Sequence, residues 1–272
     1  MVWLAVSGMT AVALAASSSL GQATSDDSLI RGLEWRNVSN NMGGRAVTAV
    51  GVRSNPHLYY AGYAGGGLWK TEDGGRSWHN ISDGFFDSGS IGDIAVYNQD
   101  PSIIHAGAGE APARGEMSTF GDGMYKSIDA GRTWKHIGLK DTKQIARVLI
   151  DPKDPNRVYV AAQGDQWGPN DERGVYRSAG GGVTWKRVLF VSDIAGASDL
   201  AMDPNNPRVL YAGFWDHQRT PWDFRTIGPG SGLWKSADGG DTWMQLQWGL
   251  PRLMGKVRIA VTPSKRGCTY EI

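Results

Sequence analysis

The chain has 272 residues, of which 40% are hydrophobic and 20% charged, so it encodes one or two packed domains and is not disordered. Its formal net charge is +1 and its basic residues form no run, which argues against a nucleic-acid-binding surface. The single cysteine, Cys268, excludes an intrachain disulfide, and no motif indicates a metal or nucleotide site, so no cofactor is expected.

The N-terminal segment, residues 1–23, is predicted to be a signal peptide. Residues 3–16 are mostly apolar and uncharged, and Gly21 and Ala23 fit a small-x-small cleavage site. No Lys or Arg precedes the apolar run, and a membrane anchor is the alternative, although a span needs about 20 apolar residues. We therefore expect an exported protein, periplasmic or extracellular, with a linker at residues 24–32 and no stable membrane span after signal cleavage.

An internal repeat dominates the rest of the sequence. Octapeptides at residues 71–78, 127–134, 178–185 and 236–243 share the pattern Ser/Thr-x-Asp-x-Gly-x-Ser/Thr-Trp, with Gly180 replacing the acid in the third copy. Upstream of each copy, a short apolar strand, a turn with proline and an aromatic strand recur. In the first block this predicts strands at residues 46–52, 58–63, 68–71 and 77–81. Four antiparallel strands in a block of about 50 residues match a propeller blade.

These repeats predict an all-β chain, a β-propeller of four complete blades plus a partial fifth. The expected segments are an orphan ring-closing strand at 33–39, blades at 45–82, 91–138, 145–190 and 198–247, and the start of a fifth blade at 257–272. Because unpaired sheet edges are a liability, the orphan strand and the half blade favour an incomplete, fragmentary ring. A closed four-bladed ring is the alternative, but it leaves both segments unexplained.

The octapeptides are predicted to be structural. Asp side chains accept hydrogen bonds from nearby backbone N–H groups and hold tight turns, and a Trp at each copy packs between blades. Gly180 supports this role, since a turn tolerates an extra glycine whereas a catalytic acid cannot be replaced by one. The predicted structural residues are Asp73, Trp78, Asp129, Trp134, Trp185, Asp238 and Trp243.

The octapeptides resemble the BNR/Asp-box repeats of sialidases, xyloglucan-degrading glycoside hydrolases and the sortilin N-terminal propeller. Residues 60–71, 121–127 and 228–236 are similar to large exported bacterial repeat proteins described as sortilin-like or glycosyl-hydrolase-like. The resemblance covers residues 33–261 and implies a propeller, not an activity. In the xyloglucan-degrading enzymes a catalytic acid precedes the Gly pair that opens the third strand of the first blade, and Ala64 occupies that place here. No sialidase-type arginine triad is recognisable.

The variable connections at residues 107–123, 163–174 and 214–232 are expected on the face opposite the octapeptides, where a rigid scaffold usually carries its binding residues. Trp stacks on sugars or apolar groups, and Arg clamps carboxylates. The candidate ligand-binding residues are Glu110, Arg114, Glu116, Trp167, Asp171, Glu172, Arg173, Trp215, Asp216, Arg219 and Trp222. Asp122, Asp165, His217 and Arg225 share these loops. Alternatively, the charged residues pair with one another, the tryptophans fill gaps between blades, and residues 171–173 form a solvated turn.

Two functions follow. The first is a binding module that holds an extended peptide or glycan on this loop face. The alternative is a glycoside hydrolase, xyloglucanase-like or sialidase-like, which ordinarily needs two carboxyl groups and would take a partner acid from further blades. A chain without stable activity is a third reading. The sequence does not predict the oligomeric state.

Overall fold

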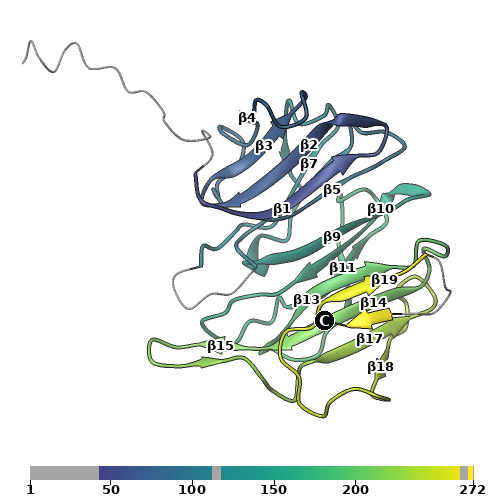
Figure 1. Ribbon diagram of the computed structural model, residues 1–272. Coiled ribbons are helices and arrows are strands. Elements are labelled where there is room, and N and C mark those ends of the chain that lie inside the picture. The colour runs from purple at the N-terminus through teal and green to yellow at the C-terminus, as the bar shows by residue number, and fades with distance from the viewer. Residues whose placement is uncertain (1–42, 112–117, 264–268, 272) are drawn as a thin grey trace, which may run out of the picture. The chain divides into compact units, whose positions relative to one another are not determined.

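The computed structural model of the protein describes residues 43–111, 118–263 and 269–271 (Figure 1). The chain divides into Met1–Asn40 and Asn41–Ile272, and the described residues all belong to the second unit. The predicted signal peptide, linker and strand at 33–39 lie outside the described residues, as do Arg114 and Glu116. In the described part, no helix is long and apolar enough to cross a membrane.

Almost all the regular secondary structure of the described residues is β-strand, and most of the strands form four four-stranded antiparallel sheets. The first two sheets are β1 (Arg45–Val52), β2 (Asn55–Ala64), β3 (Gly67–Thr71), β4 (His79–Asn80), and β5 (Ile91–Val96), β6 (Ile104–Ala108), β7 (Met124–Ser127), β8 (Lys135–His136). The next two are β9 (Ile145–Asp151), β10 (Asp154–Ala162), β11 (Gly174–Ser178), β12 (Lys186–Leu189), and β13 (Ala195–Met202), β14 (Leu210–Asp216), β17 (Gly232–Ser236), β18 (Met244–Leu246). The all-β propeller prediction is confirmed.

Three short elements complete the architecture. A hairpin of β15 (Gln218–Arg219) and β16 (Phe224–Arg225) projects from the connection between β14 and β17, and the sequence did not predict it (Figure 1). A 3-10 turn, η1 (Lys140–Thr142), precedes the third sheet. After the fourth sheet, β19 (Ile259–Val261) pairs with β20 (Thr269–Glu271), as expected for the first two strands of a further repeat.

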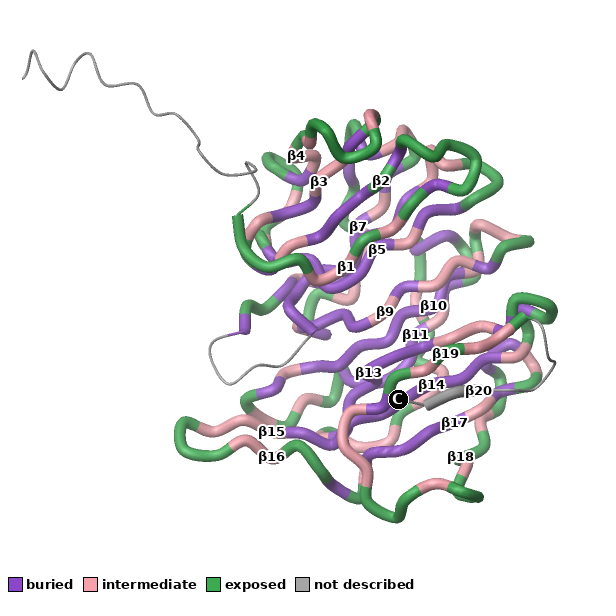
Figure 2. The backbone as a smooth tube through the Cα atoms, in the orientation of Figure 1, coloured by how far each residue is buried: buried purple, intermediate pink, exposed green. Residues whose placement is uncertain are grey.

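The core lies between successive sheets. The first strands β1, β5, β9, β13 and β19 lie beside one another in chain order, and buried aromatic and aliphatic side chains from both neighbours fill each junction. Burial of a thin sheet therefore depends on having a neighbour on each side. The first strands show this directly: β5 is almost wholly buried, whereas Val52 is the one buried residue of β1 (Figure 2).

Each octapeptide forms the turn between the third and fourth strands of its sheet. Asp73 Oδ1 accepts the backbone N–H groups of Arg76 and Ser77, both at 2.9 Å, and the acids of the second and fourth copies bind their turns in the same way. In the third copy, where Gly180 replaces the acid, the Ser178 hydroxyl still accepts N–H groups at 3.1 and 2.8 Å. A Ser/Thr hydroxyl and glycines thus suffice to close the turn.

The octapeptide turns lie against the turns between first and second strands. In each of the four sheets, a backbone N–H of the octapeptide donates to the backbone carbonyl of the residue that directly follows the proline of the same repeat. The four pairs are Gly74 to His57, Ala130 to Ser102, Gly181 to Asn156 and Gly239 to Arg208. One face of the sheets therefore carries these compact turns, and the long connections lie at the opposite strand ends, which we call the loop face.

Candidate functional site

Loops from different sheets meet on the loop face. The Arg219 N–H donates to the Gln166 carbonyl at 2.7 Å, joining the loops of the third and fourth sheets. Lys256, in the connection to β19, donates to the carbonyl of Ala111 at 3.3 Å, and Arg45 at the start of β1 binds Glu110. Segments far apart in sequence are thus brought to one face by the order of the strands.

The loop between β14 and β17 carries an aromatic cluster. The Trp215 ring stacks on His217 at 4.2 Å between centroids, and its indole N–H donates to the Thr226 carbonyl at 2.7 Å. The Arg219 guanidinium lies 5.9 Å from the ring of Trp167 and 5.2 Å from that of Phe224. We call Trp167, Trp215, His217, Arg219 and Phe224 the aromatic cluster.

Two aromatic side chains of this region reach solvent. Trp222, at the tip of the β15–β16 hairpin, is 85% exposed, and Trp167 is 37% exposed. Trp215 is almost wholly buried, so it supports the hairpin and is covered by it. The three predicted tryptophans therefore divide into one that holds the loop and two that can contact a ligand.

Three buried glutamines lie in the loops that precede β9 and follow β10. Gln144, Gln163 and Gln166 are fully buried. Within the part of the chain that the structure describes, both side-chain amide atoms of Gln144 and of Gln166, and Oε1 of Gln163, have no hydrogen-bond partner. Gln163 Nε2 lies 3.3 Å from His217 Nε2. Buried polar atoms without partners are costly and rare in folded proteins. Sequence reasoning missed these residues, because a glutamine in a loop gives no sign of burial.

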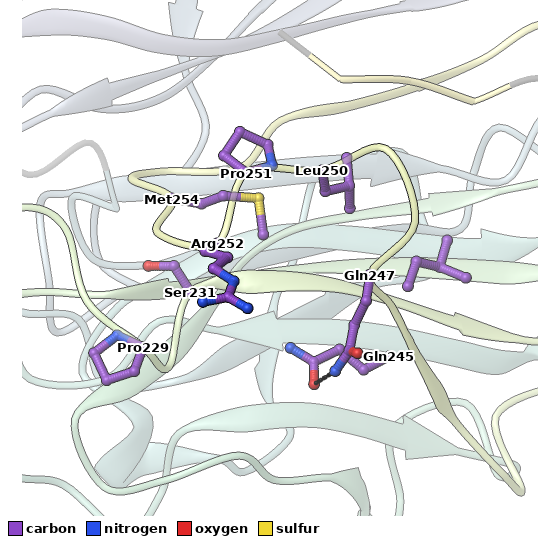
Figure 3. Close-up of a pocket in the computed structure, with 9 residues that line it drawn as sticks. Pro229, Ser231, Gln245, Gln247, Leu250, Pro251, Arg252 and Met254 are labelled. Carbon is purple, nitrogen blue, oxygen red and sulfur yellow. Dashed lines mark hydrogen bonds between the residues drawn. The ribbon is translucent and has the colours of Figure 1, made fainter.

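A pocket of about 370 Å³ lies beside the fourth sheet (Figure 3). Its lining residues come from the end of the β14–β17 loop, from β18 and from the segment after β18, and they are Pro229, Ser231, Gln245, Leu246, Gln247, Leu250, Pro251, Arg252 and Met254. Ser231 Oγ accepts the Asp216 N–H at 2.9 Å, so the pocket adjoins the strand end that carries the aromatic cluster. Trp248, next to the pocket lining in sequence, is 99% exposed.

The predicted acids are engaged in holding the loops. Glu110 and Asp216 are each 1% exposed. Arg45 binds Glu110, and Arg225 lies 2.9 Å from Asp216 Oδ1. Glu172 is exposed and accepts the Tyr176 hydroxyl at 2.8 Å, and the exposed Asp171 offers its carbonyl to a neighbouring arginine. Glu110 and Asp216, which are both buried, are thus each paired with a cation.

Arg173, a predicted ligand clamp, is fully buried and organises its own loop. Its guanidinium donates to the carbonyls of Gln163 at 2.8 Å and Gly168 at 3.1 Å, and also to that of Asp165. Burial lowers its pKa to about 10. The side chain therefore fixes the backbone between β10 and β11, beside the buried glutamines.

Ala64, which stands where the resemblance to xyloglucan-degrading enzymes implies a catalytic acid, has no group that can donate or accept a proton. Ala64 is the last residue of β2 and is buried.

Nearer the aromatic cluster, Lys256 lies 5.1 Å from the Trp215 ring, and burial lowers the pKa of Lys256 to about 7. Within residues 43–111, 118–263 and 269–271, no three His, Cys, Asp or Glu side chains are grouped to hold a metal ion.

Comparison with known proteins agrees with this architecture. No protein-family model matches the chain. The xyloglucanase Xgh74A of Acetivibrio thermocellus is 30% identical over 177 residues, which are 56% of this chain and 19% of that protein. The photosystem II assembly lipoprotein Ycf48 of Picosynechococcus is 24% identical over 179 residues, 56% of this chain and 51% of that protein.

Among solved structures, an ancestral GH74 enzyme superposes with a TM-score of 0.61 at 21% identity, over 82% of this chain and 28% of that chain. This likeness shows the fold. Together with the sequence relatives, it makes the chain a β-propeller related to glycosyl hydrolases. The chain spans about a fifth of the length of the xyloglucanase it matches.

Proposed function

We propose that this propeller binds an extended glycan across its loop face without hydrolysing it. The observation that carries the proposal is the combination, on one face, of solvent-reaching tryptophans with a polar pocket and buried amides. Trp167 and Trp222 offer aromatic surfaces, and the pocket beside β18 presents Gln245, Gln247 and Arg252.

The chemistry of this face suits a sugar chain. A pyranose ring has an apolar C–H surface that stacks on an indole, and hydroxyl groups that both donate and accept hydrogen bonds. A glutamine amide also does both, which makes it a natural partner for hydroxyls. The similarity to xyloglucanases supports a glycan over a peptide as the ligand class.

Hydrolysis is disfavoured by the state of the acids. A glycosidase ordinarily needs one carboxyl to protonate the leaving group and a second to act as base or nucleophile. Glu110 and Asp216 are buried and paired with Arg45 and Arg225, and Ala64 stands where the family acid is expected.

A glycoside hydrolase is the second candidate function, and the likeness to enzymes named xyloglucanases favours it. The two functions are separated by one pair of measurements on the same sample. Isothermal titration with xyloglucan oligosaccharides reports binding, and chromatography of the mixture after prolonged incubation reports cleavage. We expect saturable binding with intact oligosaccharide; shortened products would establish the hydrolase instead.

Two variants locate the binding. Trp222→Ala removes an exposed ring and should weaken binding about fivefold, in line with roughly 1 kcal/mol for an aromatic contact. Tyr59→Ala is the matched control, because Tyr59 is 40% exposed but lies on β2, away from the β14–β17 loop. Equal affinities of the two variants for the oligosaccharide, or preferential binding of an extended peptide, would contradict the proposal.

A further inference from the structure

A small cavity lies between the first strands of the sheets, beside the loop face. Its volume is about 40 Å³, which admits a carboxylate group but not a sugar ring, because one water molecule needs roughly 10–15 Å³. Residues of β1, β5 and β9 line it, together with Ala111 of the loop after β6 and Arg258, which directly precedes β19. We call it the first-strand cavity. Segments of several repeats therefore meet there.

Charged residues of alternating sign occupy one equivalent position of the first strands. Asp93 accepts the N–H of the residue after Arg147, and Asp199 accepts the N–H of the residue after Arg258. These contacts align Asp93, Arg147, Asp199 and Arg258 in successive repeats. Arg147 has an acid on each side, at 3.8 Å from Asp93 and 2.8 Å from Asp199. By the same pattern, Arg258 has Asp199 on the preceding strand.

Asp199 is nevertheless occupied by other donors. Its Oδ1 accepts the Leu200 N–H and the Nε–H of Arg147, and its Oδ2 accepts the Ile259 N–H. Of the ion pairs within residues 43–111, 118–263 and 269–271, none includes Arg258. Arg258 therefore lines the cavity as a cation that no acid of the described chain neutralises.

Lys256 brings a second cation to the same place. Its Nζ lies 3.3 Å from the carbonyl oxygen of Ala111, which lines the cavity together with Arg258. The same ammonium lies 5.1 Å from the ring of Trp215, in the aromatic cluster. No acid in the described part of the chain forms an ion pair with Lys256. Burial, and then the charge of Arg258, lower its pKa to about 7, so the two cations are close enough to repel each other.

We propose that the glycan bound on the loop face is acidic, and that Arg258 and Lys256 hold a sugar carboxylate at the first-strand cavity. This inference rests on the proposed function and names its ligand class. A guanidinium can bind a carboxylate through two parallel N–H groups, and an ammonium adds a further charge-assisted hydrogen bond. A bound carboxylate also offsets the cost of keeping Lys256 charged in a buried place.

The probes are an oligosaccharide that ends in glucuronic acid and the same oligosaccharide with this carboxyl group reduced to a primary alcohol. Isothermal titration of the full chain at constant ionic strength should show the acid binding at least tenfold more tightly than the alcohol. Arg258→Gln and Lys256→Gln should each weaken binding of the acid about fivefold and leave binding of the alcohol unchanged. Arg208→Gln is the matched control, because Arg208 is also exposed but lies on the octapeptide face.

The possible failures point to different claims. Equal affinities for the acid and the alcohol would overturn the carboxylate site and leave glycan binding intact. A full preference for the acid in Arg258→Gln, or an equal loss in Arg208→Gln, would overturn the assignment to the first-strand cavity. Arg258 is exposed, so this variant keeps its fold and the comparison can be made. Binding of neither oligosaccharide would instead contradict glycan binding itself, and the acidic ligand with it.

Discussion

Asp93 on β5 accepts the backbone N–H of Val148 on β9, with 2.8 Å between Oδ2 and N, and so joins the second and third sheets. Asp199 on β13 binds the N–H of Ile259 on β19 in the same way at 2.9 Å. Between them Arg147 lies 2.8 Å from Asp199 and 3.8 Å from Asp93. Each of these three charged residues directly follows an irregularity in the β-ladder at the same place in its strand. β-Bulges re-aim side chains in this way.

This buried network predicts that the sheets are coupled through a few polar side chains. Asp93→Ala would leave the Val148 N–H and the Thr48 hydroxyl, which Asp93 accepts at 2.8 Å, without partners. We expect it to lower the free energy of unfolding by about 3–5 kcal/mol. Asp93→Asn keeps an acceptor oxygen and should cost less. Urea denaturation compares the two, and equal costs would show that hydrogen bonding to Asp93 does not matter.

The third octapeptide predicts a stabilising substitution. Gly180→Asp should restore the carboxylate that the other turns use, and a Cβ added at this position would make only an ordinary van der Waals contact, with Val183 Cβ at 3.6 Å. Hydrogen bonds from Thr133 lower the pKa of the equivalent Asp129 to about 2. An aspartate whose pKa is lower in the folded chain than in the unfolded chain, where it is about 4, stabilises the folded protein at pH values above about 4. This stabilisation is lost as the pH falls toward 2. Thermal melts should therefore show a higher Tm at pH 7 and no difference near pH 2.

The backbone φ angles of the octapeptide turns predict that an Ala→Gly and a Gly→Ala substitution have opposite effects on stability. Ala130 has a φ of 60°, while the equivalent Gly74 has a φ of 75°. Positive φ strains an L-residue, so Ala130→Gly should stabilise by about 0.5–1 kcal/mol, and Gly74→Ala should destabilise by a similar amount. A Cβ on Gly74 would lie 3.4 Å from His57 Nδ1, so the cost there comes mainly from the backbone. Denaturant midpoints that move in the same direction for both would refute this.

His105 predicts an acid-sensitive core. It replaces the repeat's tyrosine; Tyr159, for example, donates to the Gly239 carbonyl at 2.8 Å. Among the described residues, neither ring nitrogen of the buried His105 has a hydrogen-bond partner, and burial lowers the His105 pKa to about 3. The Gly181 carbonyl, which corresponds to the Gly239 carbonyl, accepts the Lys126 ammonium instead. Because the unfolded histidine takes up a proton below about pH 6.5, stability should fall from there toward pH 3.

His105→Tyr should flatten this acid dependence and raise stability at pH 7 by about 1 kcal/mol through a restored hydrogen bond. Unfolding followed at pH 7 and pH 4.5 measures both effects. An unchanged loss of stability between the two pH values would assign the acid sensitivity to other groups, of which the buried His217 is the first to consider.

The strands were predictable because their boundaries are set locally. Proline, glycine and the octapeptide pattern mark each turn, so the predicted first block at residues 46–52, 58–63, 68–71 and 77–81 lies close to β1 to β4. The placement of long connections opposite the octapeptides followed from strand order alone. Both inferences use short-range chemistry that a single sequence contains.

The site was predictable only in part, since its contacts join distant segments. Trp222 and Arg219 were chosen for their residue type, and they do lie on one exposed hairpin. The unpartnered amides of Gln144 and Gln166 were missed because burial in a loop depends on how neighbouring sheets pack. Arg173 has the residue type of a ligand clamp, but its donors are bound to carbonyls of its own loop, which sequence spacing does not reveal.

Hydrogen–deuterium exchange with and without a xyloglucan oligosaccharide is the most direct test of glycan binding on the loop face, because it reports where the chain is contacted. Glycan binding on the loop face predicts slower exchange in residues 163–173 and 215–225 and in the segment after β18, with unchanged exchange in the octapeptide turns. Protection confined to the octapeptide turns, or none at a saturating oligosaccharide concentration, would contradict glycan binding on the loop face.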